Sequence, residues 1–324
     1  MTALSVSLPR ADTAWGRTLP LLGGAWLAIL ALFWRDAAQI FDIWWNISTY
    51  NHCLLILPIL GWLVWQRQQE LAALTPAAWW PGLAWSALAA LFWLIGDAFD
   101  INFARHLALA MMLQGGVLAL CGPMVARGLA FPLFFSFFLV PFGDELIYPL
   151  QVLTADMSMV LLGWSGVPAH LNGLYISTPA GLFHVAEACS GVKFLIAMLA
   201  LGALVANLCF ESWRRRAVLL AACVIVSIIA NGIRAWGTMI IAHYRGLDFA
   251  AGFDHIFYGW IFFGIVIALI LAAAWPFFDK AADAPAFDPA RLQGSFAGRI
   301  EPLPAAVATV AIPALALAFA ALLL

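Results

Sequence analysis

Long apolar stretches alternate with short polar segments along the whole chain. A helix needs about 20 apolar residues to cross the hydrocarbon core of a membrane. Stretches close to this length predict membrane-spanning helices near residues 19–34, 52–66, 77–96, 106–126, 128–143, 193–210, 217–241, 256–276 and 305–324. The expected fold class is therefore all-α: a polytopic transmembrane helical bundle with an eight-span body and one additional C-terminal span.

Two segments are too polar, or too rich in proline and glycine, to be read as spans. Residues 144–188 are expected to form an amphipathic helix over 148–164 and then a structured, turn-rich loop on the outer face, before the sixth span. Within that loop, the alternation of apolar and polar positions over 174–178 favours a short strand. Residues 277–304 are polar and contain proline, which is typical of a linker, here on the cytoplasmic side.

The predicted spans and the linker divide the chain into three parts. Residues 1–276 form the eight-span body, residues 277–304 the cytoplasmic linker, and residues 305–324 an additional C-terminal transmembrane helix. This last helix is either a plain ninth span or the start of a truncated fused module, and both interpretations stay open at this point.

Composition and charge agree with a membrane protein and give its orientation. Of the 324 residues, 65% are hydrophobic and only 10% are charged, far from the balance of a soluble domain. The longest basic run is Arg214–Arg216, which is typical of a cytoplasmic loop, so no nucleic-acid partner is expected. With the N-terminus inside, ten of the 15 Lys and Arg residues fall on the cytoplasmic side, which the positive-inside rule favours.

The first candidate for chemistry is the segment Glu187-Ala-Cys-Ser-Gly-Val-Lys193, at the outer entrance of the sixth span. A thiol at a helix N-terminus is near the positive end of the helix dipole, which favours thiolate, and Lys193 adds a cation one turn after Cys189. Gly191 leaves room for a substrate backbone, and Ser190 can cap the helix or donate to an oxyanion. Taken alone, the motif is more typical of a buried structural cysteine than of a nucleophile.

Two further motifs lie at the ends of the next two spans. Asn231 and Arg234 are one turn apart in an apolar helix, where a guanidinium needs a partner or a function, or else extends to the interface as an anchor. Asp254 and His255 begin the eighth span, where Asp254 either orients the imidazole or caps the helix. The predicted topology brings the cysteine of the first motif, Arg234 and His255 to the same leaflet, at the ends of three consecutive spans.

This combination of side chains suits acyl transfer. A thiolate can attack a peptide carbonyl while an arginine stabilises the oxyanion and a histidine protonates the leaving amine. An amine, a hydroxyl acceptor or water can then resolve the thioacyl enzyme, with the histidine as base. The catalytic candidates are therefore Cys189, Arg234 and His255, with Glu187, Ser190, Gly191, Lys193, Asn231 and Asp254 as supporting or substrate-binding residues.

The three motifs, in this order, resemble the exosortase/archaeosortase family, and most closely the bacterial exosortase A group. Similarity is strongest over residues 141–193 and continues in NGIRAW around Arg234 and in DHIFYGW around His255. It covers roughly residues 19–276 and implies Cys189 as nucleophile, Arg234 as the oxyanion-stabilising cation and His255 as acid/base. Lys193 stands where the family commonly has arginine, which keeps the cation but loses the bidentate fork.

The resemblance also implies the substrate and the setting. The family's substrates are secreted proteins with a C-terminal PEP-CTERM sorting signal, which includes a transmembrane helix and a short Pro-Glu-Pro-like motif outside it. The implied setting is the inner membrane of a Gram-negative bacterium that makes exopolysaccharide, with the active site at the periplasmic face. We expect membrane lipid and these substrates as partners, an unidentified acceptor nucleophile, and no cofactor. The outer loop within residues 144–188 is the candidate surface for the substrate motif.

Three other classes of protein are weighed against this interpretation. A multi-span transporter could place charged residues along a pathway, but no internal repeat is visible. A haem or metal protein is disfavoured because the six His include no pair at i, i+4 on one helix. A structural subunit of an exopolysaccharide-export system predicts that the three catalytic candidates tolerate substitution. Serine proteolysis lacks a G-x-S-x-G motif.

Overall fold

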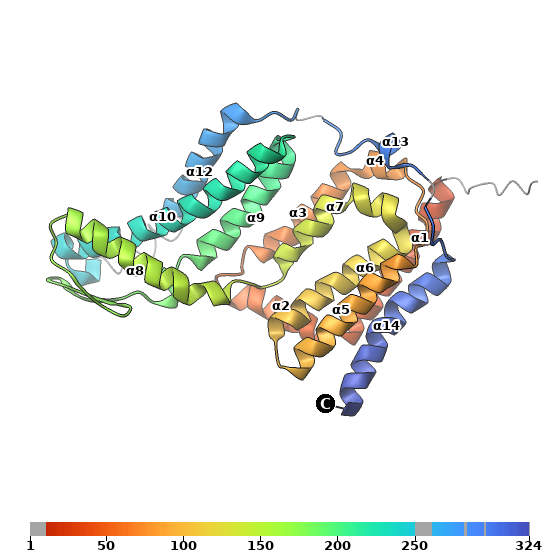
Figure 1. The fold of residues 1–324 in the computed structure, drawn as a ribbon, viewed down its shortest axis with the longest axis horizontal. Helices are drawn as coiled ribbons and strands as arrows, with labels where there is room; N and C mark the ends of the chain where they lie inside the picture. The colour runs from red at the N-terminus through yellow and green to blue at the C-terminus, as the bar shows by residue number, and fades with distance from the viewer. Residues whose placement is uncertain (1–10, 250–260, 282–283, 295, 324) are drawn as a thin grey trace, which may run out of the picture. The chain divides into compact units, whose positions relative to one another are not determined.

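The computed structural model describes residues 11–249, 261–281, 284–294 and 296–323, which are mostly helical (Figure 1). The chain separates into two compact units, residues 1–141 with 284–324 and residues 142–283. The first unit contains α1 (Ala11–Leu32), α2 (Trp34–Asn46), α3 (Cys53–Gln66), α4 (Gln68–Ala72), α5 (Pro81–Ala98), α6 (Asn102–Gly128), α7 (Ala130–Phe135), η1 (Ser136–Leu139), α13 (Pro289–Leu292) and α14 (Pro302–Leu323). The second contains η2 (Asp144–Leu146), α8 (Ile147–Trp164), β1 (His170–Asn172), β2 (Tyr175–Thr178), β3 (Gly181–His184), η3 (Glu187–Cys189), α9 (Val192–Cys209), α10 (Trp213–Arg245), α12 (Phe263–Ala274) and η5 (Trp275–Phe277).

Within the described residues, seven helices are long and apolar enough to cross a membrane. They are α1, α5, α6, α8 with its preceding turn, α9, α10 and α14. The predicted spans at 52–66 and 128–143 correspond to apolar helices that are shorter than this, at Cys53–Gln66 and Ala130–Leu139. A helix is present where one was predicted at 148–164, but the prediction that it lies outside the spans was wrong by length and composition: with the turn before it, α8 is apolar enough to cross a membrane because its polar residues are few. A mostly helical fold with several candidate spans is confirmed.

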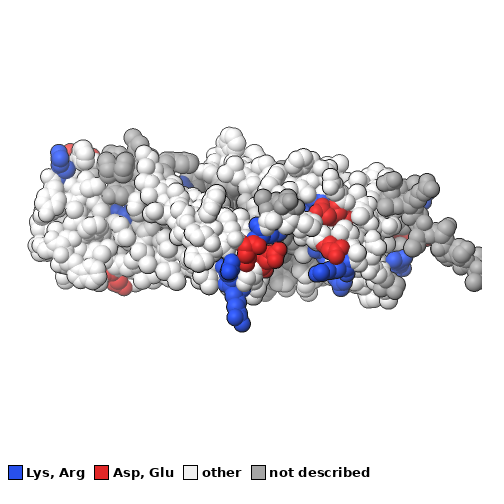
Figure 2. Space-filling view, turned by 90° about the horizontal axis from the view of Figure 1, so that it is seen from above, with Lys and Arg blue, Asp and Glu red and all other residues white. Residues whose placement is uncertain are grey.

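The surface of the chain fits a lipid environment. Large apolar side chains are exposed on α1, α5, α8, α10 and α14, for example Leu27, Leu91, Val160, Ile225 and Leu315. On the face drawn in Figure 2, most of the visible side chains are neither acidic nor basic. Water would penalise so much exposed apolar surface, whereas lipid tails do not.

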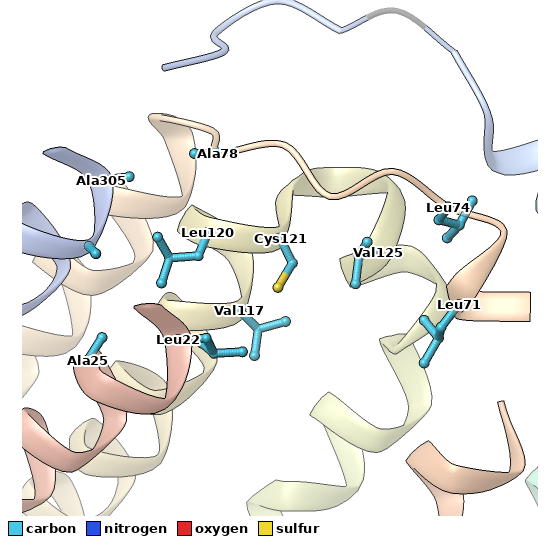
Figure 3. Close-up of a cluster of buried hydrophobic side chains, with 11 residues drawn as sticks. Leu22, Ala25, Leu71, Leu74, Ala78, Val117, Leu120, Cys121, Val125 and Ala305 are labelled. Atoms are coloured by element: carbon cyan, nitrogen blue, oxygen red, sulfur yellow. The ribbon is translucent and has the colours of Figure 1, made fainter. Parts of the chain in front are cut away.

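A core of small and branched side chains holds the first unit together (Figure 3). Leu22 of α1 meets Val117 and Leu120 of α6, and the buried Ala305 of α14 belongs to the same cluster. α14 packs against α1, α5 and α6. Gly82 allows α5 to lie directly on the backbone of α6, because a Cβ at this position would collide with Ala119. The C-terminal helix is therefore an integral part of this unit.

A buried carboxylate joins three helices of the first unit. Asp36 of α2 is 2% exposed and accepts hydrogen bonds from Arg105 of α6, at 2.7 and 2.8 Å, and from the indole N–H of Trp93 in α5, at 3.0 Å. A buried charge is tolerated only when it is paired and hydrogen-bonded, and here both carboxylate oxygens have a donor. This pair fixes the relative position of α2, α5 and α6.

The second unit consists of a helical layer and a small sheet. α10 packs against α8, α9 and α12. The three strands are antiparallel in the order β1-β2-β3, and the strand expected at 174–178 corresponds to β2. Ile176 at the centre of the sheet is fully buried and clusters with Leu162 of α8, Met239 of α10 and Val185 beyond β3. The sheet is thereby anchored on α8 and α10, immediately before the cysteine-containing turn.

Candidate active site

Cys189 is the last residue of the single 3-10 turn η3, three residues before α9 begins at Val192. Its backbone N–H donates to the carbonyl of Ala186 at 2.8 Å, which closes the turn. Gly191 then adopts a left-handed conformation, with φ of 82°, that lets the chain enter α9 directly. The half-buried Cys189 therefore lies in a tight turn at the N-terminal end of α9, the position predicted from the sequence.

Gly191 has a second constraint, which comes from α10. A Cβ built on Gly191 would lie 2.6 Å from the side-chain Cγ of Asn231, so any other residue would collide with this amide. We expected Gly191 to leave room for a substrate backbone, but in the structure Asn231 occupies that room. The glycine is thus needed because it lets α10 approach the cysteine turn.

Asn231 uses this close approach to hold the backbone of the cysteine turn. Its Nδ2 donates to the carbonyl oxygen of Cys189 at 2.8 Å and to the hydroxyl of Thr154 in α8 at 2.9 Å. Asn231 is only 3% exposed, and Thr154 is also buried. One side-chain amide therefore connects α10, α8 and the residue that carries the thiol.

A second amide holds the other end of the same segment. Nε2 of Gln151 in α8 donates to the carbonyl of Val185 at 2.7 Å, so α8 is hydrogen-bonded to the chain just before η3. Gln151, Thr154 and Ser158 are all buried and recur at i, i+3 and i+7, which places them on one face of α8. Sequence reasoning missed Gln151 and Thr154, although this polar stripe in an otherwise apolar helix was a readable signal.

Arg234 follows Asn231 by one turn of α10, so both side chains lie on the same side of the helix. Its guanidinium carbon is 5.6 Å from the centroid of the Phe194 ring in α9, within the range of a cation–π contact. Phe194 itself stacks on Phe263 of α12, with ring centroids 4.7 Å apart. The aromatic pair gives the cation a defined position between α9 and α10.

Cys189, Asn231 and Arg234 line one small hollow. Its volume is about 100 Å³, and its walls are Phe183, His184, Val185, Cys189, Asn231, Arg234, Ala235, Thr238 and Met239. About 10–15 Å³ of this kind of volume is enough to hold one water molecule, so the hollow has room for several waters. The structure therefore brings the predicted nucleophile and the predicted cation to the same cavity.

The supporting residues of the cysteine segment have separate places. Ser190 is 2% exposed, and its hydroxyl accepts from the N–H of Val192 at 3.3 Å, which caps the first turn of α9. Glu187 is exposed on η3, and Lys193 is half-buried in the first turn of α9. Asp254 and His255 lie outside the described residues. Among those that are described, no group of three His, Cys, Asp or Glu side chains could hold a metal ion.

A family model described as transmembrane exosortase matches residues 44–272, which cover part of each unit and include all three predicted catalytic residues. None of the curated proteins and none of the solved structures compared with the chain matches it. Because the family model covers well over half of the chain, we conclude that this multi-pass membrane protein belongs to the transmembrane exosortase family.

Proposed function

We propose that the chain is an intramembrane cysteine protease or transpeptidase that removes C-terminal PEP-CTERM-type sorting signals from secreted proteins. The observation that carries the proposal is the shared hollow: Cys189 and Arg234 line the same small cavity. Membership of the exosortase family makes a cysteine transpeptidase the expected class of enzyme. The proposed setting is the bacterial inner membrane, with the hollow at the periplasmic face.

In the first half of the proposed reaction, the Cys189 thiolate attacks the scissile carbonyl and forms a C–S bond. The electron pair of the carbonyl moves to its oxygen, and Arg234 stabilises the oxyanion in the low dielectric of the site. The C–N bond then breaks, and the leaving amine takes a proton from the imidazolium of His255. The role of His255 comes from the family resemblance. The product of this half is a thioester between the substrate and the enzyme.

In the second half, an acceptor amine, a hydroxyl or water attacks the thioester. The acceptor gives its proton to His255, a new C–N or C–O bond forms, and the C–S bond breaks to return the thiolate. The contacts of the cysteine turn support this chemistry, because Asn231 fixes the backbone carbonyl of Cys189, a residue that lines the hollow. A nucleophile held in one orientation reacts far faster than one that samples many.

The test is to follow a reporter that carries a PEP-CTERM signal in cells that express the wild type or Cys189→Ala. We expect the wild type to shorten the reporter by its C-terminal helix, as measured by mass spectrometry, and Cys189→Ala to leave it whole. Cys209→Ala is the matched control, because Cys209 lies at the opposite end of α9 and is half-buried like Cys189. Equal processing by Cys189→Ala would overturn the proposal. If the chain were a transporter, its transport activity would not depend on this thiol.

A second pair of variants tests the cation. Arg234→Gln removes the charge, and we expect the rate of processing to fall by roughly 10²-fold or more, as when an oxyanion-stabilising donor is lost. Arg234→Lys retains the charge and should recover part of the rate. A rate for Arg234→Gln within twofold of the wild type would contradict the assigned role.

The thioester itself can be tested with the wild type. Added hydroxylamine should intercept the thioester and yield a hydroxamate at the new C-terminus of the reporter.

A further inference from the structure

β3 is the outermost strand of the sheet, and it leads directly to the nucleophile. The strand order is β1-β2-β3, and in the part of the chain that the structure describes no strand pairs with the other edge of β3. β3 ends at His184, and after Val185 and Ala186 the chain enters the turn that carries Cys189. An unpaired strand edge presents a row of backbone N–H and C=O groups that can pair with another extended chain.

The phase of the backbone shows which groups this edge presents. The N–H of Val185 donates to the carbonyl of Leu174 at 2.9 Å, so Val185 faces β2. Backbone groups alternate between the two edges of a strand, so Phe183 also faces β2, while Leu182 and His184 face outward. The carbonyl of His184 accepts from the N–H of Ala186 at 2.9 Å. The outer edge of β3 therefore offers the N–H and C=O of Leu182 and the N–H of His184.

The hollow at Cys189 lies between this strand and α10. Phe183, His184 and Val185 form one wall, and five residues of α10 that include Arg234 form much of the other. His184 belongs both to the outer edge of β3 and to the lining of the hollow, so a chain added along this edge would run toward Cys189 and Arg234.

We propose that the segment cleaved by the enzyme binds as an additional strand along the outer edge of β3. This inference rests on the proposed function, and it names the mode of substrate binding. Main-chain hydrogen bonds to Leu182 and His184 supply affinity, as in other proteins that bind peptides by strand addition. The scissile carbonyl is then delivered to Cys189 and Arg234. A helical segment has its own N–H and C=O groups paired, so the substrate must be extended here, outside its transmembrane helix.

A proline on β3 tests the edge without removing the sheet. Leu182→Pro deletes an N–H that faces outward and places a ring there, while the N–H groups that bond to β2 remain. We expect the rate of reporter processing to fall on the order of tenfold or more, because a hydrogen bond is lost and the ring obstructs the incoming strand. Leu182→Ala is the matched comparison, because it changes the same exposed side chain and keeps both backbone groups; its processing rate should exceed that of Leu182→Pro by roughly fivefold or more.

The folding of Leu182→Pro is checked by the rate at which iodoacetamide alkylates Cys189, which should equal that of the wild type. Processing of the reporter by Leu182→Pro at the wild-type rate would overturn the inference. Phe183→Pro serves as the reference for structural damage, because its N–H faces β2. It should lower the processing rate and also change the rate at which iodoacetamide alkylates Cys189.

Disulfide trapping decides the question even if the proline variant fails to fold. Leu182→Cys, placed in the Cys189→Ala protein so that the substrate stays whole, is oxidised with reporters that carry single cysteines at successive positions. Strand addition predicts that the yield alternates with a period of two residues next to the cleavage site. Trp164→Cys is the control, because Trp164 is 81% exposed at the end of α8 and should give no such pattern.

The two proposals fail in different ways. A flat yield along the reporter, or no trapping from Leu182→Cys, would overturn strand addition and leave the thiol dependence of processing intact. Processing of the reporter by the Cys189→Ala protein would overturn the proposed function itself.

Discussion

Replacing Asn231 by alanine keeps the Cys189 thiol but removes the hydrogen bond that holds its turn, so it tests how much the position of the thiol contributes to the rate. The Asn231 amide is the buried donor to the Cys189 carbonyl, at 2.8 Å, and to the Thr154 hydroxyl, at 2.9 Å. A hydroxyl can rotate toward another acceptor, as Thr side chains in helices often do, so the main loss falls on the carbonyl of Cys189. A buried acceptor without its donor costs about 1–3 kcal/mol. The turn that carries Cys189 is then free to leave the position in which Asn231 holds it.

This penalty sets the size of the expected effect. If it is expressed in the transition state, 1–3 kcal/mol corresponds to a decrease in kcat/KM of roughly five- to 150-fold. Thr154→Val keeps the shape and leaves the Asn231 bond to Cys189, so its decrease should be under about tenfold. Asn207→Ala is the matched control, because Asn207 lies in α9 far from the hollow and, among the described residues, its Nδ2 is buried without a hydrogen-bond partner.

The assay measures initial rates of reporter processing in purified membranes, with the rate of Cys189 alkylation measured in parallel. We expect Asn231→Ala to change both rates, because the turn that carries the thiol is no longer held in place. A purely structural asparagine would instead lower the amount of folded protein and leave the rates per folded molecule unchanged. Rates for Asn231→Ala within twofold of the wild type would refute the assigned positioning role.

Two further substitutions test the packing around the site and the buried ion pair. Gly191→Ala should abolish most processing and lower the thermal unfolding temperature, because its Cβ would lie 2.6 Å from Asn231 Cγ in a backbone with φ of 82°; an active, equally stable variant would contradict the described approach. Asp36→Asn leaves the partly exposed Arg105 with only the more distant carboxylate of Asp97, at 4.0 Å, and should destabilise the protein by about 1.5–3 kcal/mol. Thermal unfolding in detergent measures this loss, and an unchanged midpoint would show that the pair is dispensable.

The sequence determined the class of the protein and the candidates for its reactive groups. Runs of apolar residues are a property of the chain alone, and lipid requires helices of a certain length, so the multi-span helical class could be predicted. The motif around Cys189 and the pair Asn231 and Arg234 could be recognised because they depart from their apolar surroundings. The number of long helices was harder to predict. The apolar stretch at 52–66 was expected to be a span but forms the shorter helix α3, whereas α8, which was expected to lie outside the spans, is long and apolar enough to be one.

Only the tertiary structure decided how these residues act together. Gln151 and Thr154 lie more than 30 residues before the cysteine in the sequence, and no local pattern states that their helix packs against its turn. Gly191 looked like space for a substrate, and the structure fills that space with Asn231. Hydrogen bonds and close packing depend on distances between segments that are remote in the chain. A sequence can therefore name candidate reacting groups, but the packing of α8 and α10 around the cysteine turn determines which of them share one hollow.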